Sequence, residues 1–191
     1  MNMENRCSWA ASSEIYSNYH DTEWGKPLHD DQKLFEFLIL EGMQAGLSWI
    51  TILKKREAFR MAFDDFNVQK VAAYNSAKVE ELMNNAGIIR NRMKIEAAIT
   101  NAQSFLKIVD EFGSFDAYIW GFVNHQPIIN HWKQLSEVPA KTELSDKISA
   151  DLKKRGFKFV GSTVVYAHMQ ATGMVNDHLV SCFCHPENKG Q

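Results

Sequence analysis

Apolar residues recur at helical spacing along most of the chain. Within 49–63 they return every three or four positions, which predicts a helix that Ser48 would cap. The same spacing through 90–109 predicts a long core helix. The apolar members of these two stripes are Trp49, Ile52, Leu53, Phe59, Ile95, Ile99, Ala102, Phe105, Leu106 and Val109. Both segments are therefore expected to pack one face against a common core.

Polar cap residues predict the starts of further helices. These caps and helices are Asp31 for 34–40, Ser76 for 77–85 with Gly87 closing it, Ser114 for 115–123, Ser145 for 146–156, Ser162 for 163–173 and Asp177 for 178–182. No run alternates with a period of two, and Ile128-Ile129 is too short and isolated to build a sheet. We expect an all-α, bundle-like fold, with an extended loop over 125–139 where a minor lobe could hinge.

The composition of the 191 residues is that of a soluble globular protein. Apolar residues make up 45%, charged residues 23%, and there are only 4 prolines, which excludes disordered and collagen-like chains. Lys and Arg number 21 against 23 Asp and Glu, so binding to nucleic acid would depend on a local basic patch. The length predicts a single domain over 1–191, with room for two helical lobes around a pocket.

The segment 1–14 lacks the apolar stretch of a signal peptide, and no segment approaches the roughly 18 apolar residues of a membrane span. We therefore expect a cytoplasmic protein, monomeric and without a membrane partner. Its three cysteines are Cys7, Cys182 and Cys184. An odd number in a cytosolic chain argues against a disulfide framework and points to thiol or metal chemistry.

The segment 153–163 has the outline of a helix-hairpin-helix motif. One predicted helix ends at Gly156, and the next begins at Ser162 after a turn that closes at Gly161. Glycines let a ligand approach the backbone, and the first turn of a helix offers unpaired N–H groups, which suits a phosphate. A plain helix–helix connection with solvated lysines is the alternative. The cations of this patch are Lys153, Lys154, Arg155 and Lys158, joined by Lys54, Lys55, Arg56, Arg90, Arg92 and Lys94 if they share its face.

Two Cys/His pairs lie toward opposite ends of the sequence. His178 and Cys182 are four residues apart, so on a helix they would project from one side, while Cys7 and His20 form the other pair. Two cysteines and two histidines make a closed tetrahedral zinc site, which is structural because no position is left for water. A buried cysteine or a core histidine is the alternative for each. Nearby substitute ligands are Cys184 and His185.

A third cluster is aromatic and acidic. Glu41 ends an otherwise apolar helical run, where a carboxylate is costly unless it has a partner. A flat, electron-poor base could stack on aromatic rings and donate N–H bonds to this carboxylate. The alternative is that the rings belong to the core and that Glu41 is an exposed helix end. The aromatic residues of the cluster are Trp9, Tyr16, Tyr19, Trp24 and Trp49.

Taken together, these segments resemble the 3-methyladenine DNA glycosylase I family, bacterial alkylation-repair enzymes of the helix-hairpin-helix superfamily. The segments that carry the resemblance are 6–9 (RCSW), 19–25 (YHDTEWG), 40–56 (LEGMQAGLSWITILKKR), 86–95 (AGIIRNRMKI), 122–127 (FVNHQP) and 155–178 (RGFKFVGSTVVYAHMQATGMVNDH). They follow the family's order and span nearly the whole chain. The resemblance implies an all-α helix-hairpin-helix glycosylase fold whose N- and C-terminal segments are joined by one structural zinc ion.

The resemblance also assigns roles to individual residues. The zinc ligands would be Cys7, His20, His178 and Cys182, and Glu41 would be the carboxylate that recognises the excised base. The residues lining or supporting the base pocket would be Trp9, Tyr16, Tyr19, Trp24 and Trp49. The family's DNA-probing loop falls at Gly46 and Leu47. The residues expected to hold the DNA backbone are Lys154, Gly156, Lys158, Gly161, Ser162 and Thr163.

The implied activity is hydrolysis of the N-glycosidic bond of 3-methyladenine in double-stranded alkylated DNA, with free 3-methyladenine as product. Methylation makes the base cationic and weakens its bond to the sugar, so an enzyme can work chiefly by flipping and holding the base. The wider superfamily uses an aspartate after the hairpin that this family lacks at the usual position. Asp177 is a poor substitute, being better placed as a helix cap. No lysine stands at the lyase position, which indicates a monofunctional hydrolase.

Three other functions fit parts of the pattern. The first is a zinc-stapled DNA-binding module without catalysis, which would bind DNA with steep salt dependence and release no base. The second is a metal-dependent hydrolase of a small molecule, but four protein ligands leave no open metal position. The third is a helical scaffold, which would not explain why Glu41 follows an apolar run among aromatic residues in a chain that also has a lysine-rich glycine hairpin. The glycosylase interpretation accounts for all three clusters.

Overall fold

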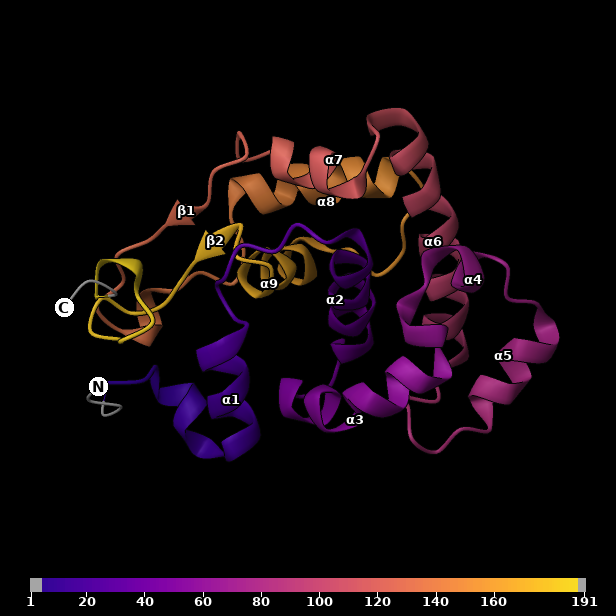
Figure 1. Cartoon of the computed structure of the whole chain (residues 1–191), viewed down its shortest axis with the longest axis horizontal. Helices are drawn as coiled ribbons and strands as arrows, with labels where there is room; N and C mark the ends of the chain where they lie inside the picture. Colours follow the sequence, from indigo (N-terminus) through magenta and orange to yellow (C-terminus); the bar gives the residue numbers. More distant parts are fainter. Residues whose placement is uncertain (1–4, 189–191) are drawn as a thin grey trace.

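The helices begin close to the polar residues that predicted them. The computed structural model describes residues 5–188 and is predominantly helical, as expected (Figure 1). The α-helices are α1 (Glu14–Thr22), α2 (Asp31–Gln44), α3 (Trp49–Ala62), α4 (Val68–Ala72), α5 (Ser76–Met83), α6 (Arg92–Phe112), α7 (Phe115–Gly121), α8 (Glu143–Lys154) and α9 (Ser162–Ala171). Short 3₁₀ turns lie at η1 (Ser8–Ser12), η2 (Asp64–Phe66), η3 (Leu135–Glu137) and η4 (Pro186–Asn188).

Several helix caps differ from the predicted residue by one to three positions. Ser114 caps α7 as expected, its hydroxyl accepting from the Ala117 N–H, whereas Asp30 rather than Asp31 caps α2. The Asp31 carboxylate instead accepts from the backbone N–H groups of Phe115 and Asp116 at 2.9 and 2.8 Å. It therefore provides acceptors for the first N–H groups of α7, which have no partner within that helix. The other shifted caps are Asn75 for α5, Thr142 for α8 and Gly161 for α9, and α6, for which no cap was predicted, is capped by Asn91.

The core lies between α2, α6 and the helices around them. Helix α2 is buried on all sides through its apolar run, and α6 contributes its predicted stripe, with Phe105 stacked on Phe115 at 4.2 Å between ring centroids. Gly113 ends α6 with φ at +88°, a conformation that glycine adopts without strain. Figure 1 shows α2 in the middle of the molecule, with α3 below it, α9 to its left and α6 to its right. Helix α2 is therefore a rigid support for the side chains that it carries.

Two predictions near the C-terminal segment are wrong. Ile128–Ile129 forms a strand, β1, which pairs in parallel with β2 at Val175–Asn176. The pair was too short to predict from pattern because its partner lies far along the chain. Residues 178–182 form no helix, and Asp177 is therefore not a helix cap. Its buried carboxylate accepts side-chain hydrogen bonds instead, and these bonds fix the strand end that carries His178.

The N-terminal segment contains a helix that the hydrophobic pattern did not predict. The hydroxyl of Ser13 accepts from the Tyr16 N–H and starts α1. Figure 1 shows α1 on the same side of the molecule as the C-terminal segment. The Phe183 N–H donates to the Asn5 carbonyl at 3.0 Å, which ties the two segments together. In the part of the chain that is described, no helix is both long and apolar enough to cross a membrane.

Candidate functional site

A cavity of about 320 Å³ opens between α1, α2, the start of α3, α9 and the 3₁₀ turn η3. The structure brings all six residues of the predicted aromatic and acidic cluster to its walls. The lining residues are Trp9, Tyr16, Tyr19, Trp24, Glu41, Gln44, Trp49, Leu135, Val138, Ala167 and Gln170. A cavity of this size, rich in aromatic rings and with few polar groups, suits a flat ring of the dimensions of a nucleobase.

Glu41 is the acidic group of this cavity. Its side chain is 4% exposed, so the alternative of an exposed helix end is wrong. Burial raises the pKa of Glu41 to about 8, because removal from water disfavours the charged form. No buried side-chain oxygen or nitrogen of the described residues lacks a hydrogen-bond partner, and no described group bonds to this carboxyl. Its oxygens are therefore open to the cavity, where a ligand can reach them.

Tyr16 joins the cavity wall to the start of α3. Its hydroxyl accepts from the Ile50 N–H at 2.9 Å, at a helix start where Ser48 makes no side-chain cap bond. The hydroxyl thus satisfies one of the unpaired N–H groups of α3. Since the oxygen accepts from the helix, its own proton is available to another partner. Trp49, at the first position of α3, is held against Tyr19 at 5.7 Å between ring centroids.

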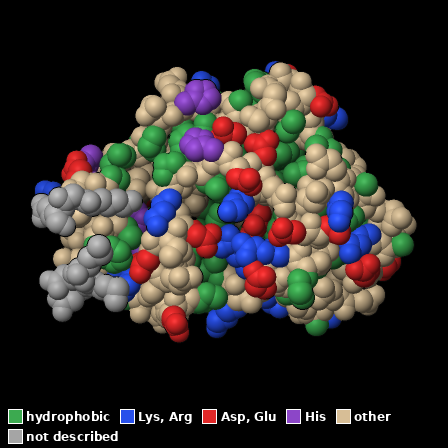
Figure 2. Space-filling model, viewed as in Figure 1, with side chains coloured by type: hydrophobic (Ala, Val, Ile, Leu, Met, Phe, Trp, Pro, Cys, Tyr) green, Lys and Arg blue, Asp and Glu red, His purple; other side chains and the backbone are tan. Residues whose placement is uncertain are grey.

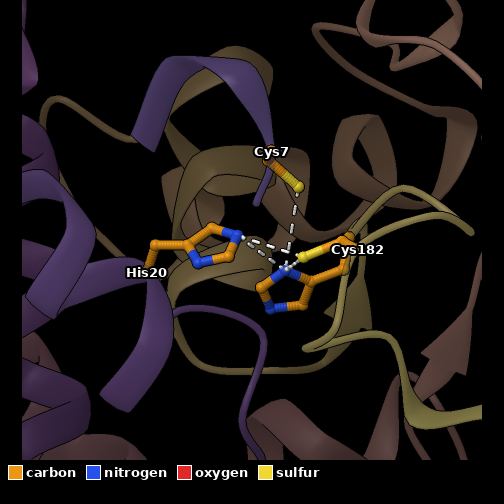
Figure 3. Close-up of side chains that lie close together, drawn as sticks. Cys7, His20 and Cys182 are labelled. Carbon is orange, nitrogen blue, oxygen red and sulfur yellow. Dashed lines mark hydrogen bonds between the residues drawn. The ribbon is translucent and has the colours of Figure 1, made fainter. Parts of the chain in front are cut away.

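The four predicted Cys/His residues lie together, as Figure 3 shows for the three that it labels. The Nδ1 atom of His178 lies 3.1 Å from Nε2 of His20, 3.6 Å from Sγ of Cys182 and 3.9 Å from Sγ of Cys7. A tetrahedral zinc ion with ordinary bond lengths separates its nitrogen and sulfur ligands by about 3.4–3.8 Å. The donor atoms and their spacing therefore fit a metal ion of that kind.

The outward-facing nitrogens of both histidines are already bonded. Nε2 of His178 donates to the Trp24 carbonyl at 3.0 Å, and Nδ1 of His20 lies 2.7 Å from a carboxylate oxygen of Asp21. Each bond leaves the other ring nitrogen as the unprotonated atom facing the cluster, the arrangement found around protein-bound metals. Hydrogen bonds from the Cys184 and Cys7 thiols lower the pKa of the Cys182 thiol, which favours the thiolate that binds metal.

The cluster supports one wall of the cavity. Trp24 packs edge-on against His178 with ring centroids 4.7 Å apart, and Trp9 packs against His20 at 5.4 Å and against Trp24 at 5.1 Å. Trp9 in turn meets Tyr16 at 5.5 Å. Loss of the cluster's geometry would therefore move the aromatic wall, although the cluster itself lies outside the cavity lining.

The predicted probing loop follows α2 directly. Gly46 has φ at +80°, and Leu47 is 41% exposed. The ammonium of Lys94 donates to the Met43 carbonyl at 2.9 Å and to the Ala45 carbonyl at 2.6 Å. Lys94 thus caps the C-terminal end of α2 and fixes the loop that carries the exposed leucine.

Hydrogen bonds from a side chain of α6 fix the hairpin between α8 and α9. The Asn101 side chain donates to the Lys158 carbonyl at 3.0 Å and accepts from its N–H at 2.8 Å. Gly156 has φ at +98°, and a Cβ there would lie 3.1 Å from Oγ of Ser104. The residues of the predicted DNA-backbone contact are exposed or partly exposed, namely Lys154, Gly156, Lys158, Gly161, Ser162 and Thr163. No side chain caps α9, so its first N–H groups lack a side-chain partner.

Three of the cations that could have extended the basic patch are engaged by other groups. Arg56 pairs with Glu23 at 2.8 Å and Glu36 at 2.7 Å, and Arg92 pairs with Glu80. Lys94 is buried against α2. On the face shown in Figure 2, acidic and basic side chains are interspersed. Carboxylates neutralise Arg56 and Arg92, a pairing that a count of lysines and arginines cannot reveal.

Five cavity residues escaped the sequence reasoning. Gln44 lies within the LEGMQAGLSW block and could have been found as a polar residue one helical turn after Glu41. Gln170 lies on α9 and was read only as part of a helix. The other three carry no polar signal at all, and they are Leu135, Val138 and Ala167.

Comparison with known proteins gives one consistent result. The family model of methyladenine glycosylase matches residues 9–185. The chain is 53% identical over 184 residues to DNA-3-methyladenine glycosylase 1 of Escherichia coli (strain K12), covering 96% of this chain and 98% of that protein. A crystal structure of a 3-methyladenine DNA glycosylase I matches with a TM-score of 0.92 and 50% identity, over 95% of this chain and 100% of the other. A structure describing 3-methyladenine recognition by the Staphylococcus aureus enzyme matches with a TM-score of 0.93 and 39% identity, over 96% and 98%.

Proposed function

This chain belongs to the methyladenine glycosylase family, and from that premise we propose that it hydrolyses the N-glycosidic bond of 3-methyladenine in alkylated DNA. The observation that carries the proposal is Glu41, a carboxyl without a protein partner that opens into an aromatic cavity. Residues 1–191 would act as one glycosylase domain. Its substrate would be double-stranded DNA, its product the free base, and it would work as a monomer.

The raised pKa of Glu41 suits a cationic base. In the free protein at neutral pH the carboxyl is mostly protonated, because its pKa is about 8. A cationic base that enters the cavity stabilises the carboxylate form and lowers this pKa. The carboxylate would then accept N–H hydrogen bonds from the base while Trp49 and Tyr16 contact the ring. Unmodified adenine carries no charge, so it gains no such ionic partner and is bound less well.

Catalysis would follow from holding the base. The methylated base leaves as a neutral molecule, so cleavage needs little acid catalysis; water bonds to the anomeric carbon of the sugar in place of the base and releases a proton to solvent. The cavity lining of the described residues contains no lysine, which supports a monofunctional hydrolase rather than a Schiff-base lyase. In this scheme Glu41 binds the base, and Trp9, Tyr19 and Trp24 shape and support the pocket.

DNA would be bound by two elements. The exposed Leu47 and its neighbour Gly46 would enter the gap left by a flipped nucleotide, which compensates part of the few kcal/mol that unstacking costs. The hairpin would hold the phosphate backbone through its lysines and through the uncapped start of α9. The contact residues are those expected from the sequence, with Lys154, Lys158 and Thr163 the exposed ones.

The Cys/His cluster would hold one structural zinc ion. Two histidines and two cysteines fill all four tetrahedral positions, so the ion would leave no site for a reacting water. When bound, it would keep α1 and the C-terminal segment in register and so keep the aromatic wall in place.

The test uses the purified chain and methylated duplex DNA. The enzyme should release 3-methyladenine, identified by chromatography, with little 7-methylguanine, and should leave the abasic strands unbroken at neutral pH. Glu41→Gln should lower the single-turnover rate by about tenfold or more, because the ionic contact with the cationic base is lost. DNA binding without base release would instead favour the non-catalytic binding module.

A further inference from the structure

We propose that Gln170 is a second hydrogen-bond acceptor for the base, fixed in that orientation by Asp177, and that the pair Glu41 and Gln170 selects an exocyclic amino group over a carbonyl. This inference rests on the proposed function. It assigns a specificity role to a residue of α9 and a positioning role to a buried carboxylate.

Asp177 is saturated with hydrogen bonds. Its side chain is 2% exposed. One oxygen accepts from Asn130 at 2.7 Å and from the Trp132 indole at 2.8 Å. The other oxygen accepts from the Tyr166 hydroxyl at 2.5 Å and from Nε2 of Gln170 at 2.9 Å. Four donors fill the acceptor positions of a carboxylate, so Asp177 has none left for a ligand.

This arrangement fixes which way the Gln170 amide faces. The nitrogen of the amide donates to the Asp177 carboxyl at 2.9 Å, so the oxygen of the amide points away from it. No described residue donates to that oxygen. Since every buried side-chain polar atom of the described residues has a partner, this oxygen is open to solvent, and Gln170 lines the cavity. Glu41 and Gln170 therefore each present to the cavity an acceptor that has no donor among the described residues.

Two acceptors in one cavity match an amino group. The exocyclic amine of adenine has two N–H bonds that diverge, so each can go to a different oxygen. Guanine carries a carbonyl oxygen at the same position, which donates nothing and would face the Gln170 oxygen without a hydrogen bond. A buried polar group left unpaired is unfavourable, so such a site rejects the wrong base more strongly than it favours the right one.

The experiment measures the affinity of free 3-methyladenine and free 3-methylguanine by tryptophan fluorescence quenching. These bases share the methyl position; at C6 one carries an amine and the other a carbonyl, and guanine also has an N1–H and an amine at C2. Gln170→Leu keeps much of the bulk of the side chain and removes its amide, both the oxygen and the nitrogen that donates to Asp177. We expect its affinity for 3-methyladenine to fall about five- to tenfold and its affinity for 3-methylguanine to change less than twofold. The relative single-turnover excision of the two bases from methylated DNA should shift in the same direction.

Two control variants separate this role from a structural one. Tyr166→Phe removes a different donor from the same oxygen of Asp177 and leaves Gln170 in place, so the preference between the bases should not change. Gln103→Leu alters an exposed glutamine on α6 and should leave both affinities at the wild-type value. Thermal melting checks that each variant folds.

The outcomes are distinct. If wild-type protein neither binds nor releases 3-methyladenine, the proposed function itself fails. If wild type does both, the inference is overturned when Gln170→Leu leaves the preference unchanged, when it weakens both bases equally, or when Tyr166→Phe shifts the preference to the same extent.

Discussion

Replacement of Glu41 by glutamine should change how the stability of the protein depends on pH. The folded protein holds the Glu41 pKa at about 8, against an ordinary value of 4.5, so between these values the folded state binds more protons than the unfolded state. Stability contributed by this group is therefore complete below about pH 4.5 and falls as the pH rises. Relative to acid pH, the free energy of unfolding is lower by about 3 kcal/mol at pH 7 and by about 5 kcal/mol well above pH 8.

Glutamine occupies nearly the same volume and does not ionise. The difference in unfolding free energy between Glu41→Gln and wild type should therefore increase by about 3 kcal/mol from pH 4.5 to pH 7 and level off above pH 8. Urea unfolding, followed by tryptophan fluorescence at each pH with zinc present, measures both proteins. Protonation of the Cys/His cluster at low pH affects both and cancels in the difference. Stability curves that run parallel over this whole range would refute the account of Glu41 as a carboxyl desolvated without a partner.

Three further predictions concern the metal cluster, the probing loop and the hairpin. Cys7→Ser should lose bound zinc in elemental analysis and melt several degrees earlier, because the four-ligand shell is broken; equal metal content would contradict the assignment. Leu47→Ala should bind free 3-methyladenine within twofold of wild type but excise it from duplex DNA about tenfold more slowly, since the exposed leucine lies outside the cavity lining. Gly156→Ala should lower stability by about 1 kcal/mol or more and weaken DNA binding, because φ is +98° and Ser104 leaves little room; unchanged urea midpoints would disprove the strain.

Short-range patterns predicted the helical fold well. Helices α3, α6 and α7 follow from apolar spacing and caps, and each begins within two residues of its predicted start. The misplaced caps arose where several polar residues adjoin, as at Asp30 and Asp31, because sequence does not reveal which carboxylate faces its own helix and which reaches another. The parallel pairing of Ile128 with Val175 was not predictable from local pattern, since the two strands contain only two residues each.

The site was predictable where chemistry and family resemblance acted together. Residue type made Glu41 and the four Cys/His residues stand out, and the fold brings each set together. Gln170 gave no signal, because an isolated glutamine on a helix is usually solvated. Its role depends on the orientation that Asp177 imposes from another segment. The sequence had suggested that Asp177 caps a helix. Its actual role as a buried hydrogen-bond acceptor depends on donors that lie far from it in the sequence or on another element.

The contact between the segments that carry Cys7 and His178 has a consequence for folding during synthesis. Cys7 and His178 are 171 residues apart and meet in one cluster, and Trp9 and Trp24 pack on the histidines of that cluster. Contacts so distant in sequence close late in folding. A ribosome that has not yet released His178 and Cys182 therefore holds a chain whose helical core can form while one wall of the base cavity cannot. The ability to recognise a damaged base should appear only after the segment with His178 and Cys182 has been synthesised.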